Sequence, residues 1–307
     1  MNETITALAF CFNEEKRIGS FLDALCGFAP VTVVDNHSTD RTVAIARSRA
    51  RKVITHRNAG YAEHPDTVRY ILNETDTPWI YWGRVDEIPP APLLLRLDEI
   101  CRSDAADVVF VARRNMLFGR AVRSWGDDYQ MLFFKGAALE ARDSALFEMT
   151  ALKPGARVLR LPAEPALSLW HFSAYDIAAY TATNNRYSSL AAKEIIRRRA
   201  TEANYSVSRE RSKRWVKAGV GWIQSCRPLW MVRVLTMPTL RFFWHYGFRG
   251  GFRSGREGFV TSYLMMMEQM LIELKLAEAD AGITLEGIER DYDRLKAALI
   301  AGEVPSR

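Results

Sequence analysis

The sequence is poor in cysteine and has no long apolar run. Its four cysteines, Cys11, Cys26, Cys101 and Cys226, are widely separated, and none belongs to a Cys-x-x-Cys pair. This spacing argues against a zinc site or a disulfide framework and is typical of a reducing compartment. No stretch of eighteen uncharged apolar residues occurs, so we expect no helix that crosses a bilayer.

The N-terminus lacks the features of an export signal. The first ten residues, MNETITALAF, contain no basic region followed by an apolar one. We therefore expect a cytoplasmic protein. What the chain has is apolar content: 48% of its 307 residues are hydrophobic, enough to bury a substantial core.

Positive charge is concentrated in one part of the chain. The whole sequence carries +6, but residues 184–256 hold 16 Lys and Arg, three acidic residues and eleven aromatic residues. The remainder is net acidic. A basic and aromatic mixture suits an anionic membrane surface or nucleic acid. The alternative is a solvated helical face over an ordinary aromatic core.

The pattern of the chain changes near residue 175. Before it, the apolar runs TALAFCF, VTVV, KVIT and PWIYW alternate with helical patterns, which predicts βαβ units and a mostly parallel sheet. After it, the pattern is helical, with helices expected over DIAAYTATNNRYSSLAAKEIIRRRA, around Trp215 to Gln224 and from about Glu257 to Glu278. We expect a domain over residues 1–175 and a helical extension over residues 176–307.

Polar residues follow each predicted strand. Asn13 and Glu14 follow the first, and a run from Asp35 to Asp40 follows the second. Ser38 or Thr39 can cap the next helix. Asp35, at a strand end, can accept hydrogen bonds from a base or a sugar, as acidic residues do in nucleotide-binding α/β folds.

Three motifs, FCFNEEKRIGSFLDAL, VTVVDNHSTDRTVAIAR and WIYWGRVDEIPP, occur in that order. Together they resemble the family-2 glycosyltransferases of GT-A fold, and most closely the branch that decorates lipopolysaccharide cores. LWHFSAYDIAAYTATNNRYSSLAA and YGFRGGFRSGREGF resemble the C-terminal motifs of that branch. The resemblance implies an α/β fold of GT-A type, Rossmann-related, with a mostly parallel sheet between helices and a helical C-terminal extension.

The resemblance also implies an activity. It predicts metal-dependent, inverting transfer of a hexose from a nucleotide-sugar, with a UDP-sugar as the expected donor, to a glycan or a lipid-linked acceptor. In the family, the first two motifs bind the nucleotide-sugar donor. The residues of this chain that match them are Phe12, Asn13, Glu14, Asp35, Asn36 and Ser38.

The third motif departs from the family pattern. Arg84 stands where the family has the first Asp of an Asp-x-Asp metal motif, while Asp86 matches the second and is the expected ligand of Mn²⁺ or Mg²⁺. Arg84 can supply positive charge to the donor's diphosphate. It can also mark a weakened metal site or a non-catalytic relative that only binds a sugar-nucleotide or glycan.

A second departure lies in HRNAGYAEHPDTVRYIL, where His64, Pro65 and Asp66 replace a motif with a basic residue. Arg69, one turn into a helix that begins at Pro65, can replace that basic residue in donor binding. The alternative is an ordinary solvent-facing arginine.

Inverting transfer needs a base that takes the proton of the acceptor hydroxyl. Glu148 matches the family's base motif, and Asp127 and Asp128 are the competing carboxylates. His171 matches a histidine that completes the metal shell in relatives of this fold, although a lone histidine after a strand is often structural.

The basic and aromatic region suggests the acceptor's location. We expect residues 184–256 to meet a glycolipid at the inner face of an anionic membrane, with Arg233 and Arg241 preventing full insertion. The rival from another class is a nucleic-acid-binding protein. No recognition motif supports it and the first half is net acidic, so no nucleic-acid partner is expected.

Overall fold

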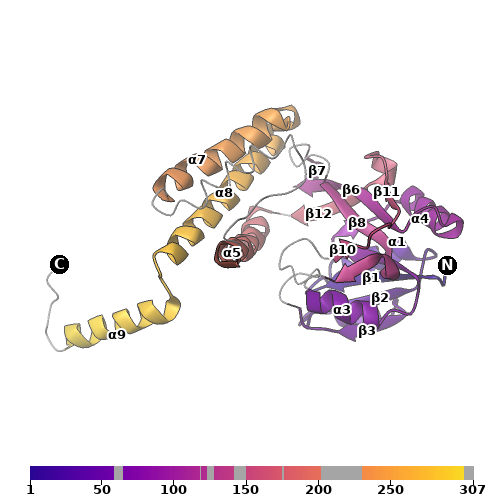
Figure 1. The fold of residues 1–307 in the computed structure, drawn as a ribbon, viewed down its shortest axis with the longest axis horizontal. Coiled ribbons are helices and arrows are strands. Elements are labelled where there is room, and N and C mark those ends of the chain that lie inside the picture. The colour runs from indigo at the N-terminus through magenta and orange to yellow at the C-terminus, as the bar shows by residue number, and fades with distance from the viewer. Residues whose placement is uncertain are drawn as a thin grey trace. The chain divides into compact units, whose positions relative to one another are not determined.

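Parallel strands alternate with short helices at the N-terminal end of the computed structural model (Figure 1). Strands β1 (Ile5–Cys11), β2 (Val31–Asp35), β3 (Lys52–Thr55) and β4 (Trp79–Arg84) are linked by helices α1 (Ile18–Leu25), α2 (Thr42–Arg47) and α3 (Pro65–Asn73), and α4 (Ala91–Ser103) follows. The structure describes residues 1–58, 65–117, 119–122, 128–141, 150–174, 176–201 and 230–300.

The later strands extend this sheet in mixed directions. Strand β8 (Asp128–Lys135) runs antiparallel between β4 and β6 (Val108–Leu117), and β12 (Leu169–Ala174) is parallel to β6. Three short strands of the described residues, β5 (Glu87–Ile88), β7 (Arg120–Ala121) and β11 (Val158–Arg160), also belong to this sheet, while β9 (Leu139–Ala141) and β10 (Thr150–Leu152) form a separate pair. The sheet order is β3-β2-β1-β4-β8-β6-β12-β5.

Helices cover both faces of the sheet, which explains the unbroken apolar run of β4. Trp79 and Tyr81 pack in one buried cluster with residues of α1 and α4, whereas Ile80 and Trp82 pack in another with residues of α3. A strand buried on both faces needs apolar side chains at every position. The predicted α/β sheet between helices is therefore confirmed.

Gly83 ends this apolar run for a steric reason. A Cβ at this position would lie 2.6 Å from the backbone oxygen of Leu8 and 2.6 Å from the ring of Phe21. Only glycine lets β1 and α1 approach β4 this closely. The close packing fixes the end of β4, where Arg84 is the last residue and Asp86 follows.

The chain divides into two units. The first consists of Met1–Tyr180 and His245–Thr261, and the second of Thr181–Trp244 and Ser262–Arg307. Among the described residues, the α-helices after β12 are α5 (Ile177–Thr201), α7 (Trp230–Phe243), α8 (Gly255–Asp280) and α9 (Leu285–Ile300), with a π-helical turn at Trp244–Phe248. The expected helix around Trp215 to Gln224 lies outside the described residues.

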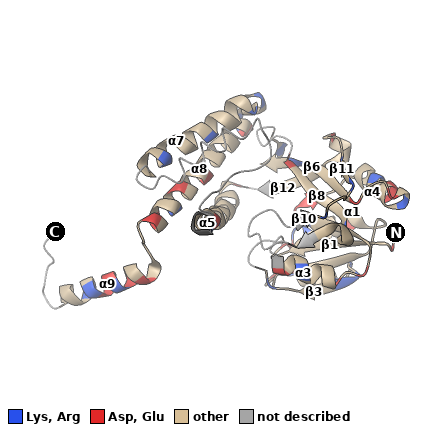
Figure 2. Cartoon of the chain, viewed as in Figure 1, with Lys and Arg blue, Asp and Glu red and all other residues tan. Residues whose placement is uncertain are grey.

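Ion pairs join α7 to α8 in the second unit. The Arg233 side chain is fully buried, with its Nε 3.1 Å from Glu273 Oε2. Arg241 Nη2 lies 2.7 Å from Glu268 Oε2. Figure 2 shows the basic residues of α7 and the acidic residues of α8. The expectation that Arg233 faces a membrane is therefore wrong, because its side chain is fully buried. Arg241 is 28% exposed and likewise pairs with α8.

None of the helices in the described part of the chain is both long and apolar enough to span a bilayer.

Candidate functional site

The turns after β1 and β2 are bonded to each other. The Asn13 N–H donates to Ser38 Oγ at 2.9 Å, and the Thr39 N–H donates to Asn13 Oδ1 at 2.8 Å. The Ser38 N–H donates to the buried carboxylate of Asp35 at 3.1 Å. Asn13 has a φ of 55°, a left-handed conformation that asparagine adopts more readily than most residues. The structure thus brings together Asn13, Asp35 and Ser38.

Phe12 and Asn36 flank these turns. Phe12 is 48% exposed, so its ring offers a flat apolar surface on which a base can stack. The Asn36 side chain exchanges two hydrogen bonds with Asn58, each of 3.0 Å, one to the side chain and one from the backbone N–H. Asn36 therefore fixes the segment that follows β3.

Glu14 forms an ion pair with Arg17, which lies at the start of α1. The Arg17 guanidinium donates to both carboxylate oxygens of Glu14, with Nη2 2.6 Å from Oε1. Arg17 Nη1 also donates to the backbone oxygen of Phe172 at 3.4 Å. Burial raises the pKa of the Glu14 carboxyl, although Arg17 opposes that change. This pair links the turn after β1 to β12.

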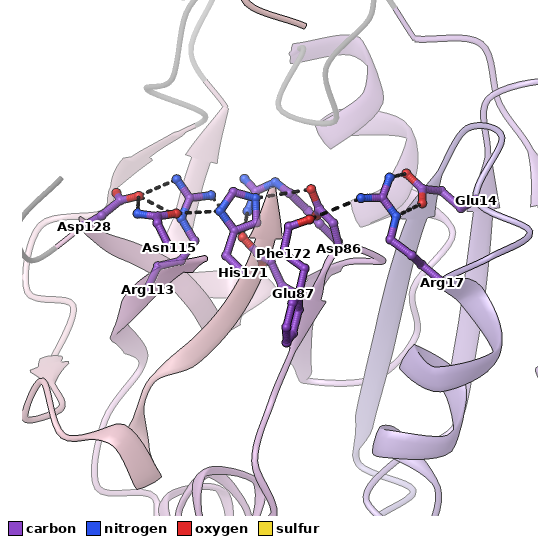
Figure 3. Close-up of polar contacts among 10 residues, drawn as sticks. Glu14, Arg17, Asp86, Glu87, Arg113, Asn115, Asp128, His171 and Phe172 are labelled. Atoms are coloured by element: carbon purple, nitrogen blue, oxygen red, sulfur yellow. Dashed lines mark hydrogen bonds and ion pairs between the residues drawn. The ribbon is translucent and has the colours of Figure 1, made fainter. Parts of the chain in front are cut away.

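Asp86 and His171 face each other where β4 ends and β12 passes (Figure 3). His171 Nε2 lies 3.2 Å from Asp86 Oδ2. The Phe172 N–H donates to the backbone oxygen of Asp86 at 2.8 Å, which fixes the two segments relative to each other. Both side chains are partly accessible, with exposed fractions of 27% for Asp86 and 13% for His171.

Asn115 of β6 connects His171 to Asp128. Its Oδ1 lies 2.6 Å from His171 Nδ1, and its Nδ2 donates to Asp128 Oδ2 at 3.4 Å (Figure 3). Strand register explains this arrangement, because Asn115 pairs with His171 of β12, and Arg113, two residues earlier on β6, pairs with Asp128 of β8. Residues two apart on a strand share one face.

Glu87 accepts from two arginines. Its Oε1 lies 3.1 Å from Arg113 Nη1 and 3.4 Å from Arg84 Nη1, and its side chain is fully buried. Arg113 also donates to Asp128 through Nε at 2.7 Å. Alternating charges thus run from Arg84 through Glu87 and Arg113 to Asp128, which balances buried charges that would be costly alone.

Neighbouring side chains keep two carboxyl groups ionised. Burial by itself would raise the pKa of Asp86, but the contact with His171 and the positive charges of Arg17 and Arg84 outweigh it and hold that pKa well below its usual range. Burial likewise opposes ionisation of Asp128, and Arg113 together with side-chain hydrogen bonds lowers its pKa. Both groups carry negative charge at neutral pH.

The Asp86 and His171 side chains suit a divalent cation. Their facing atoms lie 3.2 Å apart, close to the roughly 3 Å between adjacent ligands of an octahedral ion with bonds of about 2.1 Å. Within the described ranges, no group of three or more His, Cys, Asp and Glu side chains could hold a metal ion. A cation at this pair would therefore take further ligands from a bound molecule or from water.

The remaining predicted residues are Glu148, Asp127 and Arg69. Glu148 and Asp127 lie outside the described residues. Arg69 lies on α3, where its Nη2 donates to Asp66 at 2.7 Å, and none of the hydrogen bonds around Asp86 reported above involves it.

Sequence reasoning missed Arg17, Arg113 and Asn115. The last two lie in VVFVARRNML, an apolar strand that carries Arg and Asn two residues apart. Polar residues that share one face of a buried strand are the signal that could have identified them. Arg17 carries no comparable signal, because it lies in the polar run that precedes α1.

No protein-family model matches the sequence, and neither does any curated protein. Solved structures do match the fold. The mannosyltransferase PcManGT from Pyrobaculum calidifontis, solved with GDP-Man and Mn²⁺, matches with a TM-score of 0.51 and 12% identity over 90% of this chain and 87% of that chain.

Two other matches have lower scores. TarS 1–349 from S. aureus matches with a TM-score of 0.42 and 13% identity over 92% of both chains. Glucosyl-3-phosphoglycerate synthase from Mycobacterium tuberculosis, solved with Mn²⁺ and UDP, has a TM-score of 0.31 and 21% identity over 37% of this chain and 45% of that chain. The likeness to PcManGT confirms the expected α/β fold of GT-A type with a helical C-terminal part.

Proposed function

We propose that this chain is a glycosyltransferase that moves a hexose from a UDP-sugar to a glycan or lipid-linked acceptor, with inversion and with a divalent metal. The observation that carries the proposal is the Asp86–His171 pair at the end of β4. Support comes from the fold that the chain shares with PcManGT, a mannosyltransferase solved with GDP-Man and Mn²⁺. The family-2 motifs motivate the choice of UDP and of inversion.

Asp86 and His171 would hold the cation on the donor's diphosphate. When bound, a divalent cation neutralises charge on the departing nucleoside diphosphate. The Glu87 carboxylate forms ion pairs with both Arg84 and Arg113 beside this position. A guanidinium suits phosphate oxygens. Arg84, which stands where the family has a metal-binding Asp, would therefore bind the diphosphate directly.

Glu148 remains the proposed base. It would accept the proton of the acceptor hydroxyl as that oxygen attacks the anomeric carbon, while the bond to the nucleoside diphosphate breaks. The contacts of Asp128 support a positioning role for this competitor, because Arg113, Asn115 and Gln130 all donate to its carboxylate.

A non-catalytic relative is the second candidate, and Arg84 in the metal motif is the observation that favours it. Such a protein would bind the sugar-nucleotide or a glycan without turnover. The nucleic-acid alternative loses support, since Arg233 and Arg241 are part of the basic region but are held in ion pairs with acidic residues of α8.

The exposed side chains of α7 indicate which kind of acceptor the protein meets. The two charged residues of this helix, Arg233 and Arg241, are paired with α8. The exposed hydrophobic residues of α7 are Trp230, Met231, Val232, Leu235, Leu240 and Phe243. The hydroxyls of Thr236 and Thr239 each donate to the backbone oxygen four residues earlier at 2.7 Å, so neither needs a bond from water.

Such a face suits the interfacial region of a lipid bilayer. The hydrocarbon of a bilayer has no hydrogen-bond donors or acceptors. A helix whose exposed side chains are apolar, or hydrogen-bonded to its own backbone, needs none from its surroundings. At 14 residues, α7 is too short to span a bilayer and would lie in its plane. We therefore retain a lipid-linked acceptor, with apolar contact through α7 in place of the expected attraction through Arg233 and Arg241.

A thermal-shift panel tests the donor and the metal together. UDP-, GDP-, CMP- and dTDP-sugars are added with and without Mn²⁺ to the wild type, to Asp86→Ala and to the control Asp293→Ala, which changes an exposed carboxylate of α9. A ligand at 100 times its Kd stabilises the folded state by about 2.7 kcal/mol. We expect a rise in Tm of several degrees with UDP-sugars and Mn²⁺, retained in Asp293→Ala and lost in Asp86→Ala.

Release of UDP from the stabilising donor, measured with glycan and glycolipid acceptors, separates the two candidates. Binding with turnover supports the transferase, and binding with no turnover across the acceptor panel supports the non-catalytic relative. A wild type whose Tm responds to no sugar-nucleotide would overturn both.

A further inference from the structure

Asn115 is a buried residue with no place in the motifs, and it contacts one of the two proposed metal ligands. It is 5% exposed, and its Oδ1 lies 2.6 Å from His171 Nδ1. We propose that Asn115 is a positioning residue that keeps the Nε2 lone pair of His171 directed at Asp86, so that the two bind a divalent cation instead of each other. The inference rests on the proposed function and adds a residue to its metal site.

The orientation of the Asn115 amide follows from its other neighbour. The carboxylate of Asp128 is ionised and can only accept hydrogen bonds. The Asn115 atom 3.4 Å from it must therefore be the NH₂ group. This leaves the amide oxygen facing His171, so His171 Nδ1 must carry a proton and donate it to Asn115 Oδ1.

Asp128 is itself held in place, which makes this orientation stable. Its Oδ2 accepts from Arg113 Nε at 2.7 Å, and its Oδ1 accepts from Gln130 Nε2 at 2.8 Å. Arg113 is anchored a second time on the buried carboxylate of Glu87 at 3.1 Å. A chain of donors and acceptors thus runs from Glu87 to the imidazole ring.

The consequence appears at the opposite side of the ring. With a single ring proton held on Nδ1, Nε2 is an acceptor, and it faces another acceptor, Asp86 Oδ2, at 3.2 Å. Two acceptors at this distance repel unless a cation lies between them, and that cation is either a second ring proton or a metal ion. Metal-binding histidines commonly donate their second ring N–H in this way, and loss of the partner typically weakens metal binding 10- to 100-fold.

Without Asn115 the pair could be satisfied with no metal. The neutral ring could then carry its proton on Nε2 and donate it to Asp86. A cation would have to displace that proton before binding. Asn115 thus excludes the arrangement in which a ring with a single proton donates it to Asp86, so that a second proton or a metal ion is needed to join the two proposed ligands.

The test compares Asn115→Leu with Gln130→Met. Leucine is similar in size to asparagine but cannot accept the Nδ1 proton. Gln130→Met removes a different hydrogen bond from the same Asp128 and leaves the Asn115–His171 contact in place. Binding of Mn²⁺ alone and with UDP-sugar is measured by the electron paramagnetic resonance signal of free Mn²⁺. We expect Asn115→Leu to raise the Kd for Mn²⁺ roughly 10- to 100-fold and Gln130→Met to leave it within about twofold.

The ring nitrogens of His171 give a readout that needs neither metal nor turnover. Proton–nitrogen correlation spectra, assigned with His171→Gln, should show the neutral ring protonated on Nδ1 in the wild type and on Nε2 in Asn115→Leu. A wild-type ring protonated on Nε2 would overturn the inference even if no variant folds. Wild-type Mn²⁺ affinity in Asn115→Leu would overturn it while leaving the proposed function intact. A wild type that binds no Mn²⁺, with or without UDP-sugar, would remove the metal from the proposed function and this inference with it.

Discussion

Asp86 and Asp128 are two carboxylates of one network with different neighbours. Asp128 accepts from Arg113, Asn115 and Gln130, which leaves little capacity for a new proton. Asp86 is 27% exposed, and among the hydrogen bonds reported above its only side-chain contact is with His171. A base must gain a proton during the reaction, and a carboxylate saturated with donors does so poorly. Asp128 is therefore a poor candidate for the base, and separate tests of Asp128 and of the proposed base Glu148 can check this.

Glu148→Gln keeps the shape of the side chain and removes its ability to accept a proton. We expect UDP-sugar binding to persist while kcat falls by about two to four orders of magnitude. The loss should remain at saturating Mn²⁺. Initial rates over a range of Mn²⁺ concentrations, with UDP-sugar binding measured in parallel, provide the check.

Asp128→Asn serves as the matched comparison. Because Asp128 orients Asn115, we expect this variant to need more Mn²⁺ yet to keep a kcat within about tenfold of wild type once Mn²⁺ saturates. An inactive Asp128→Asn at saturating Mn²⁺, together with an unimpaired Glu148→Gln, would transfer the role of base to Asp128.

The sequence predicted the residues that occur in motifs and missed those that depend on strand pairing. Asp86 and His171 were identified from motif order although they are 85 positions apart, and the structure places them side by side. Arg113 and Asn115 join them only because β6 lies between β8 and β12 in one register. Such long-range pairing leaves no periodic pattern in a single sequence. The roles of all these residues in binding and catalysis stay predictions.

At the scale of elements, the strongest periodic patterns gave the most accurate expectations. The helix expected from about Glu257 to Glu278 is α8, Gly255–Asp280. The four parallel strands expected from βαβ alternation are β1 to β4. Strand β8 was not foreseen as an antiparallel neighbour of β4, because alternation indicates where strands occur and does not indicate which strands pair.

Lys275 of α8 joins α5 to α8 in the second unit. Its Nζ lies 2.7 Å from four oxygens, the backbone and side-chain oxygens of Asn185 and the hydroxyls of Ser188 and Ser189, among which its three N–H donors are shared. We expect Lys275→Met to lower the free energy of unfolding by about 1–3 kcal/mol, because these acceptors lose a charged donor. Thermal unfolding followed by circular dichroism measures the change.

Lys296→Met is the control for that experiment. Lys296 lies on α9, is 67% exposed and pairs with Asp293 at 3.0 Å, so its loss should cost less than about 1 kcal/mol. Equal unfolding free energies for the two variants would show that the Lys275 contacts contribute no more than an exposed ion pair.

For the molecule as a whole, the net charge of the sequence overstates the positive charge available to a partner. Arg233 and Arg241 count toward the excess in residues 184–256, but Glu273 and Glu268 neutralise them. Reversing the charge of Arg233 would bury an acid beside Glu273 and destabilise the protein, so such a variant cannot report on a membrane. Arg249, which is exposed, remains a suitable site for charge reversal.

The apolar face of α7 leads to a different expectation for membrane binding. Leu235 and Leu240 are 71% and 60% exposed, and burying such a side chain fully contributes about 1.5–3 kcal/mol. We expect co-sedimentation with both phosphatidylcholine and phosphatidylglycerol vesicles, little weakened by salt or by Arg249→Glu. Leu235→Glu/Leu240→Glu should weaken it at least about tenfold. Leu295→Glu, which changes an exposed leucine of α9, is the control and should bind as wild type does.

Three other outcomes would each contradict this expectation in a distinct way. Binding confined to anionic vesicles and lost with salt or Arg249→Glu would restore the electrostatic explanation drawn from the sequence. Equal losses in the α7 and α9 variants would show that lipid contact is not specific to α7. No binding to either vesicle would leave a soluble glycan as the better acceptor, because α7 would then lack the lipid surface that explains why its charges point inward and its apolar side chains outward.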